Sequence, residues 1–313
     1  MRRQKNAQDE IASRSPSRGG AAEQPNPVPG RRELEGRAGL ARALYLVATP
    51  IGNLGDITLR AIDTLAGSRA IACEDTRVTA KLLARHGISR PLIAYHDHNA
   101  ARVRPQLLAR LERGETIALV SDAGSPLVSD PGFKLVREAL ARGIVVTVVP
   151  GPSAAIAALQ LAGLPADRFF FAGFLPAKAA ARRSALRELA AVPGALVFFE
   201  TAPRLASALA DMAATLGPRP AAVARELTKM FEEVRRDSLS ALAHHYAEAG
   251  APKGEIAIVV APPGDSRAAV DVDRALQEAL PRLSPSAAAA EVARATGLHR
   301  RDVYRRALAL KRQ

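Results

Sequence analysis

The chain has 313 residues, of which 48% are hydrophobic, so it is long enough for two modest domains with packed cores. No run approaches the roughly 20 apolar residues of a membrane span, and the start MRRQKNAQDE lacks the apolar stretch of a signal peptide, so we expect a cytoplasmic protein without membrane contact. The single cysteine, Cys73, excludes an internal disulfide framework, and the net charge of +13 indicates either a nucleic-acid partner or a general bias toward arginine.

Residues 1–41 mix Arg, Pro, Gly, Ser and Gln, with hardly an aliphatic side chain before Leu34. Such a segment cannot bury enough apolar surface to offset the entropy lost on ordering. We therefore predict a disordered basic leader over residues 1–41.

Residues 42–150 alternate short apolar runs with longer amphipathic segments, which predicts an N-terminal α/β domain. The expected helices span residues 57–68, 76–87, 101–114 and 132–143, with Pro105 in the first turn of the third. This order predicts a mostly parallel sheet with helices on both faces. Buried strands are expected at residues 43–49, 70–74, 91–96, 116–122 and 145–151.

A second α/β domain is predicted over residues 151–264. It should begin with a helix at residues 153–164, which Ser153 is placed to cap. The expected strands are FFFAGFL, ALVFFET, AAVARELT and EIAIVVAP, with helices between the first three.

Three Gly/Pro-rich loops follow predicted strands: ATPIGNLGD, LVSDAGSPLVSDPG and VVPGPSA. Ligands of open α/β sheets bind outside the carboxyl ends of the strands, so three such loops at one edge predict a small-molecule site. The chain has neither a G-x-G-x-x-G dinucleotide fingerprint nor a P-loop. His96 and His98 lack a third ligand, so we expect no metal site.

Residues 275–313 predict a small helical extension with a helix start at Ser284 and a turn at Gly297. This is the outline of a helix-turn-helix, and from Arg294 onward it holds seven Lys or Arg residues and one acid. An ordinary helical hairpin packed on the main body is the alternative. We favour docking of RNA phosphates by Arg300, Arg301, Arg305 and Arg306.

A set of segments follows one another along the chain: LVATPIGNLGDITLRA, CEDTR, YHDHN, SDAGSPLVSDPGF, VPGPSAAIAAL, FFAGFLPAK, FFETAPR and RELTKMFEE. In this order they resemble the two-domain tetrapyrrole-methylase-like S-adenosylmethionine (SAM) enzymes, the class III methyltransferases. Within that superfamily they are similar to the branch that 2′-O-methylates a cytidine of bacterial small-subunit (16S) ribosomal RNA. The match covers about residues 43–260.

The resemblance implies SAM in a cleft between the two α/β domains, a target in the decoding region and a homodimer. By motif position, the residues that it assigns to the cofactor are Pro50, Ser121, Asp122, Ala123, Gly124, Ser125, Leu127, Ser153, Ala154, Phe199 and Leu227. Those that it assigns to substrate contact, besides the C-terminal arginines, are Asn53, Asp56, Arg77 and His98.

Asp75 and Lys229 are favoured for acid/base or substrate-orienting roles on motif position. The full set of candidates for these roles is Asp56, Glu74, Asp75, Arg77, Glu226, Lys229 and Glu232. Glu226 could equally form a structural ion pair with Lys229 or with Arg225, and Arg77 and Lys229 could hold phosphates. Lys178, Arg182, Arg183 and Arg187 form either a solvated helix face or a basic rim of the cleft.

Two other functions are weighed against ribosomal RNA methylation. One is methylation of a tetrapyrrole or another small metabolite on the same fold, which would not need the basic C-terminal unit. The other is a non-enzymatic RNA- or ribosome-binding protein, which would not need the intact DAGSP and GPSA segments.

Overall fold

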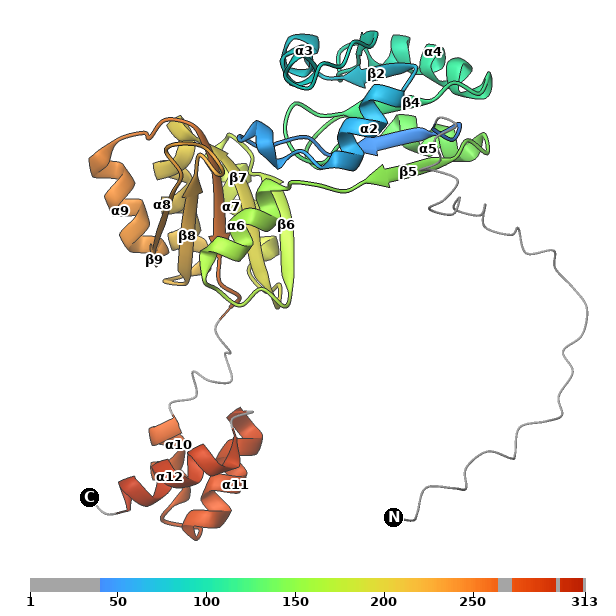
Figure 1. The fold of residues 1–313 in the computed structure, drawn as a ribbon. Coiled ribbons are helices and arrows are strands. Elements are labelled where there is room, and N and C mark those ends of the chain that lie inside the picture. The colour runs from blue at the N-terminus through green and yellow to red at the C-terminus, as the bar shows by residue number, and fades with distance from the viewer. Residues whose placement is uncertain (1–39, 264–271, 297–298, 312–313) are drawn as a thin grey trace, which may run out of the picture.

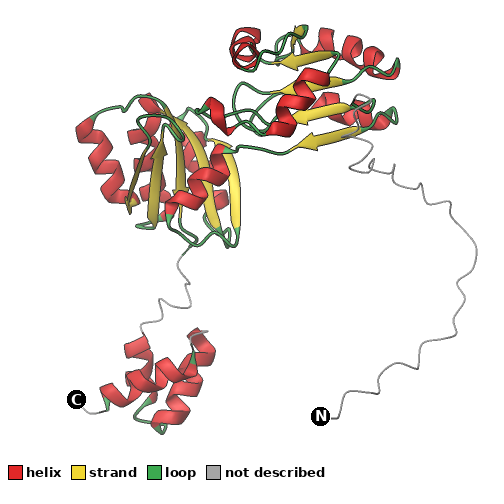
Figure 2. Cartoon of the chain, in the orientation of Figure 1, coloured by secondary structure: helices red, strands yellow, loops and turns green. Residues whose placement is uncertain are grey.

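The computed structural model describes residues 40–263, 272–296 and 299–311, so nearly all of the predicted leader lies outside the described residues. Two five-stranded sheets, each covered by helices, form the main body, and three further helices follow (Figure 1). The alternation of strands and helices along the chain is evident when the elements are coloured by type (Figure 2).

The first sheet is wholly parallel, with the order β3-β2-β4-β1-β5. Since β1 lies between two strands that come much later in the chain, the loops after β1 and β4 emerge side by side at one edge. Its strands are β1 (Leu44–Val47), β2 (Ala70–Cys73), β3 (Leu92–Ala94), β4 (Ile117–Val120) and β5 (Val146–Val149).

Helices cover both faces of this sheet, as predicted. Alternate strand residues such as Tyr45 and Ile71 pack with α2 (Leu59–Gly67) and α3 (Thr76–Arg85) on one face. The intervening residues, such as Leu44 and Ala72, pack with α4 (Ala100–Glu112) and α5 (Phe133–Ala141) on the other. The side-chain period of two along each strand produces these two cores.

One helix start differs from the prediction. Helix α4 begins at Ala100, so Pro105 lies in its second turn rather than its first. The polar turn before the helix sets this start, because the Asn99 amide donates to the carbonyl of Ala94 and its oxygen accepts from the His96 N–H.

The second sheet is mixed, with the order β6-β7-β10-β8-β9. Only β6 and β7 run parallel; β10 is antiparallel to both of its neighbours, and β8 and β9 form an antiparallel hairpin. Its strands are β6 (Phe169–Phe174), β7 (Ala195–Thr201), β8 (Pro220–Arg225), β9 (Glu233–Ser238) and β10 (Glu255–Val260). Strand β9 was not predicted, because this edge strand reads EVRRDS and carries almost no apolar pattern.

The two faces of the second sheet are covered unequally (Figure 1). A large core joins one face to α7 (Ala179–Leu189), α8 (Leu205–Leu216) and α9 (Leu239–Ala249). On the other face lies α6 (Ala154–Ala162), which packs through Ala158 and Leu159. Ile51 of the first unit joins this smaller core, so α6 and the loop after β1 cover the same face.

Helices α10 (Val272–Ala279), α11 (Pro285–Thr296) and α12 (Arg300–Leu310) share a core of their own that includes Leu276, Val292 and Val303. The helices predicted on either side of Gly297 are therefore present, and the turn itself falls on residues 297–298, outside the described residues. Within the described part of the chain, no helix has both the length and the apolar character needed to cross a membrane.

Candidate functional site

A pocket of about 410 Å³ opens where the strand-tip loops of the first sheet meet the second sheet. Its size falls in the range of small-molecule sites, and its lining is mainly apolar. The first unit and the start of α6 contribute Ile51, Ala123, Gly124, Ser125, Val128, Ser153 and Ala154. The second sheet and its loops contribute Phe174, Phe199, Glu200, Thr201, Ala202, Pro203, Leu227, Gly254, Glu255, Ile256 and Ala257.

The loop between β4 and α5 forms one wall and is fixed to the loop after β1. Thr49 and Gly124 exchange two backbone hydrogen bonds of 2.9 and 3.1 Å, and the Thr49 hydroxyl donates to the carbonyl of Ser121 at 3.0 Å. Gly124 has φ +81°, a conformation that glycine adopts without strain. Leu127 and Ser129 also have positive φ, at a cost of about 1–3 kcal/mol each. Such strain is typical of functional loops.

The opposite wall includes the tip of the β8–β9 hairpin, residues 226–232. Lys229 Nζ lies 2.8 Å from the Glu226 carboxylate and 2.9 Å from that of Glu255. Burial lowers the pKa of Lys229, but its hydrogen bonds with these two carboxylates outweigh that effect, so its pKa is raised. The hydrogen bond from Lys229 lowers the pKa of Glu226 despite partial burial. Both groups stay charged at neutral pH, which favours the structural ion pair over proton transfer.

The hairpin tip also reaches across to the first unit. The Asn53 N–H donates to the Thr228 hydroxyl at 3.0 Å, and Gly52 packs against the same segment. A Cβ at Gly52 would lie 2.6–2.8 Å from atoms of Leu227, Thr228 and Lys229. Glycine is therefore required here for the close approach of the two walls.

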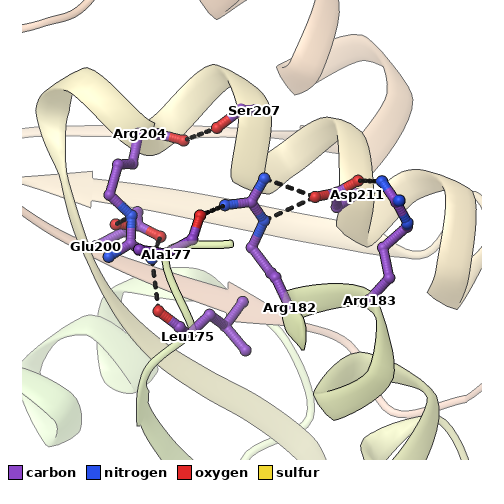
Figure 3. Close-up of polar contacts among 8 residues, drawn as sticks. All are labelled: Leu175, Ala177, Arg182, Arg183, Glu200, Arg204, Ser207 and Asp211. Atoms are coloured by element: carbon purple, nitrogen blue, oxygen red, sulfur yellow. Dashed lines mark hydrogen bonds and ion pairs between the residues drawn. The ribbon is translucent and has the colours of Figure 1, made fainter. Parts of the chain in front are cut away.

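Two ion pairs with largely buried carboxylates hold the loop after β6 (Figure 3). Arg204 pairs with Glu200 at 3.2 Å and donates to the carbonyl of Leu175. Arg182 pairs with Asp211 at 2.6 Å and donates to the carbonyl of Ala177. These contacts fix the loop after β6, next to the pocket residue Phe174.

The side chain of Arg182 is 5% exposed, so it belongs neither to a solvated helix face nor to a basic rim, and both sequence interpretations were wrong for this residue. Arg183 is half exposed and lies 3.1 Å from the same carboxylate of Asp211. A buried acid on the neighbouring helix, which the sequence pattern does not reveal, explains the difference.

The structure brings seven of the eleven residues assigned to the cofactor into the pocket lining: Ala123, Gly124, Ser125, Ser153, Ala154, Phe199 and Leu227. The other four lie close by in supporting positions. Pro50 precedes the lining residue Ile51, and the buried Ser121 hydroxyl donates to the carbonyl of Gly124. The Asp122 carboxylate accepts from the Asp75 N–H, and Leu127 packs against the core of the first sheet.

Ser153 occupies the N-cap position of α6, but its hydroxyl makes no capping hydrogen bond, so the capping prediction was wrong. Instead, Ser153 and Ala154 line the pocket. The first N–H groups of α6 thus lack a side-chain cap at the pocket, and the positive end of the helix dipole favours a negatively charged or polar ligand group there.

The candidate substrate residues of the first unit lie outside the pocket lining. Asp75 caps α3 and pairs with Arg77 at 2.6 Å; the hydrogen bonds from Arg77 lower the pKa of Asp75 to about 2. This carboxylate is therefore a weak base. Asp56 and His98 are exposed, as is Arg77. Asn53 caps the short helix η1 (Leu54–Asp56).

A cluster of carboxylates lies at the carboxyl ends of β2 and β4. Burial raises the pKa of Asp130 to about 6, and the nearby charges of Glu74 and Asp122 add to this, although a hydrogen bond with Ser121 opposes it. Burial and the charges of Asp122 and Asp97 likewise raise the pKa of Glu74. Asp130 follows Val128 of the pocket wall by two residues in the chain, and its carboxylate can accept a proton near neutral pH.

Sequence reasoning missed Asp130 and most of the second-sheet lining. The repeat of Ser-Asp in SDAGSPLVSDPG was the available signal for Asp130. For residues 254–257 there was no signal, because they lead into and begin β10, and the antiparallel direction of this strand brings its start to this edge. Among the described residues, no three His, Cys, Asp or Glu side chains are arranged so that they could hold a metal ion.

The comparisons with known proteins place the chain in a family. The Tetrapyrrole (Corrin/Porphyrin) Methylases model matches residues 43–243, and the RsmI C-terminal HTH domain matches residues 266–311. A ribosomal RNA small subunit methyltransferase I of Mesorhizobium japonicum is 53% identical, over 90% of this chain and 96% of the relative. The chain belongs to this methyltransferase family. A second member, from Pseudomonas aeruginosa, is 46% identical over 86% of this chain and 97% of its own length.

The fold of the ribosomal RNA small subunit methyltransferase I family is shared with other methylases. A uroporphyrin-III C-methyl transferase from Thermus thermophilus, complexed with S-adenyl homocysteine, matches with a TM-score of 0.50 and 21% identity, over 69% of this chain and 96% of that chain. Family membership confirms the resemblance, the two-domain fold class and the methyltransferase class that the sequence predicted.

Proposed function

We propose that this chain transfers a methyl group from SAM to the ribose 2′-hydroxyl of a cytidine in 16S ribosomal RNA, in the decoding region of the small ribosomal subunit. The observation that carries this is the 53% identity to a ribosomal RNA small subunit methyltransferase I along nearly the whole chain. The pocket and the C-terminal helices provide separate places for the methyl donor and for the RNA.

The pocket residues fit SAM. Phe174 and Phe199, with ring centroids 5.7 Å apart, and the apolar side chains of Ile51, Leu227 and Ile256 suit an adenine ring. The backbone of residues 123–125 and the uncapped start of α6 can form hydrogen bonds with the polar edge of the adenine and with the amino-acid part of SAM. When bound, SAM supplies a methyl group that is already activated on a cationic sulfur.

Two tasks remain for the protein: positioning the ribose with water excluded, and accepting the proton. SAM held in the pocket would supply its methyl group to the 2′-oxygen, and the Asp130 carboxylate would accept the hydroxyl proton. With a pKa of about 6, Asp130 is ionised at neutral pH yet basic enough to take part. Glu74 and Asp122 help to hold its pKa there.

The direct test uses the full chain, methyl-labelled SAM, and small subunits from bacterial cells that lack this enzyme, alongside naked 16S RNA and a tetrapyrrole precursor. Labelled 2′-O-methylcytidine, identified by mass spectrometry of the digested RNA, is the expected product. Label in the tetrapyrrole alone would support the metabolite methylase. Binding of subunits without any transfer would support a non-enzymatic ribosome-binding protein.

Gly52→Ala should weaken SAM binding. The added methyl group would collide with the hairpin tip and force the pocket walls apart, and overpacking of this kind costs about 1–3 kcal/mol, or about 5- to 150-fold in the SAM dissociation constant. Isothermal titration calorimetry measures the SAM dissociation constant of the variant and of the wild type. Gly55→Ala is the matched control, because its Cβ would lie 3.2 Å from one flexible side-chain atom, Asn53 Oδ1. Equal SAM affinity in both variants would contradict the close-approach argument.

The C-terminal arginines should contribute through phosphates. Arg300, Arg301, Arg305 and Arg306 are exposed on α12. Replacing all four by alanine should weaken RNA binding and reduce the slope of log affinity against log salt by about 0.7 to 0.9 for each phosphate that the protein no longer neutralises. SAM affinity should not change. The slope is measured by filter binding at several salt concentrations. An unchanged slope would show that α12 makes no phosphate contacts with the RNA.

The active form in the cytoplasm is proposed to be a homodimer. Val148 on the edge strand β5 and Phe169 and Phe170 on the edge strand β6 are exposed apolar side chains, which a second copy could cover. Light scattering coupled to gel filtration tests this, and a monomer mass at micromolar concentration would refute it.

A further inference from the structure

The tip of the β8–β9 hairpin presents two large apolar side chains to solvent. Met230 is 91% exposed and Phe231 is 68% exposed, and the pattern RELTKMFEE places both between charged residues. Large apolar side chains exposed next to each other are uncommon on a protein without a partner at that place. Either a loose loop or a fixed structure could expose them.

The tip is fixed by its own contacts. The Lys229 N–H donates to the carbonyl of Glu226 at 3.0 Å, and the Glu232 N–H donates to that of Lys229 at 3.1 Å. The Glu232 carboxylate accepts from the Thr228 N–H at 2.7 Å. The Lys229 ion pairs and positive φ values at Glu226 and Thr228 complete a tight turn. Phe231 is therefore held outward by the fold.

The exposed pair lies beside the pocket. Leu227 lines it, and Lys229, next to Met230, lies 2.9 Å from the lining residue Glu255. Thr228 bonds to Asn53 of the first unit at 3.0 Å. An RNA strand whose ribose reaches the methyl donor would thus pass close to Phe231.

The charge of the hairpin indicates how contact would be made. Residues 225–238 hold four Lys or Arg residues and four Asp or Glu residues, so the net charge is zero. Arg225 and Arg235 are both paired with Glu233. Such a segment attracts phosphates weakly, whereas an exposed aromatic ring stacks on any unpaired base.

We infer that Phe231 is a positioning residue that stacks on an unpaired base of the RNA substrate next to the target nucleotide. This inference rests on the proposed function. The base-stacking contact acts beside the phosphate contacts proposed for α12 and holds the strand where its ribose meets the pocket.

Steady-state kinetics with small subunits separate stacking from packing. Phe231→Ala should raise KM for the small ribosomal subunit, or lower kcat/KM, by about 5- to 150-fold. Phe231→Trp should keep the wild-type value, and Phe231→Leu, which is apolar but cannot stack, should resemble Phe231→Ala. SAM affinity and the salt slope of RNA binding should not change. Leu140→Ala is a matched control, because it removes an exposed apolar side chain from the last turn of α5.

The other outcomes are equally definite. Wild-type kinetics for Phe231→Ala, or recovery by Phe231→Leu, would overturn the stacking contact while leaving the methyltransferase function intact. A lower molecular mass of Phe231→Ala in light scattering would assign the residue to contact with a second copy instead. If the wild-type chain transfers no methyl group to small subunits or RNA, the proposed function fails first, and the inference fails with it.

Discussion

Asp130→Asn is expected to lower kcat for ribose methylation by about 10²- to 10⁴-fold, the usual contribution of a general base. The amide is close in size to the carboxylate but cannot accept the hydroxyl proton. Affinity for SAM should change little, because Asp130 does not line the pocket. Single-turnover methyl transfer to small subunits, with the SAM dissociation constant measured separately, distinguishes the two effects.

The pH dependence gives an independent test. Burial and the charge of Glu74 raise the pKa of Asp130 to about 6, so the active carboxylate is lost as the pH falls through 6. The wild-type rate should therefore fall on the acid side with a midpoint near pH 6. Glu74→Gln removes a neighbouring negative charge, so it should lower the pKa of Asp130 and move this midpoint to lower pH.

The contribution of Asp130 to folding stability should change with pH in the direction opposite to the rate. The folded-state pKa of Asp130 lies above its unfolded value of 3.8, so the folded protein binds the proton more tightly than the unfolded chain. This contribution to stability is full below pH 4 and is lost as the pH rises through 6. The amide of Asp130→Asn does not ionise, so the variant avoids this decrease in stability. Its free energy of unfolding at pH 8 should be at least as large as that of the wild type. A thermal melt at both pH values checks that the variant is inactive but folded.

Asp75 is the competing candidate, since the sequence motif favours it. Its pKa of about 2 and its ion pair with Arg77 make it the poorer proton acceptor. If Asp75→Asn abolished transfer and Asp130→Asn did not, the assignment of the base would be reversed.

Local patterns were sufficient to predict the first sheet. Its strands are uniform apolar runs such as AIAC and IALV, which are buried on both faces, and each helix carries apolar residues at helical spacing. The same reasoning predicted that the loops after β1, β4 and β5 would meet at one edge, and Ile51, Gly124 and Ser153 do so.

The second sheet was less accessible to such reasoning. Strand β9 lies at an edge and reads EVRRDS, with one apolar residue among six, so it lacks the apolar pattern of a strand. The direction of β10 depends on tertiary pairing rather than on its own apolar sequence. The sequence named Glu226 and Lys229 and left open whether they act on the substrate or form an ion pair, because that choice depends on which side chains meet in space. The pKa of Asp130 likewise arises from burial and from Glu74, which is 56 residues away in the chain.

The second large effect concerns stability. Asp211→Ala should lower the free energy of unfolding of the second unit by about 3–5 kcal/mol, because it leaves the buried Arg182 guanidinium without its carboxylate. The same change frees the loop that Arg182 holds through the carbonyl of Ala177, next to the pocket. Urea unfolding of the full chain measures the loss. Arg183→Ala is the control, because this half-exposed partner of Asp211 should contribute no more than about 1 kcal/mol.

A double variant separates the charge from the packing. Replacing both partners with apolar residues, as Arg182→Met with Asp211→Leu, removes the buried charges together and should recover most of the stability lost in Asp211→Ala. Such recovery would show that the single variant is unstable because a charge is stranded in the core that α7 and α8 share. A double variant as unstable as Asp211→Ala would contradict this explanation, because the apolar pair leaves no charge in the core.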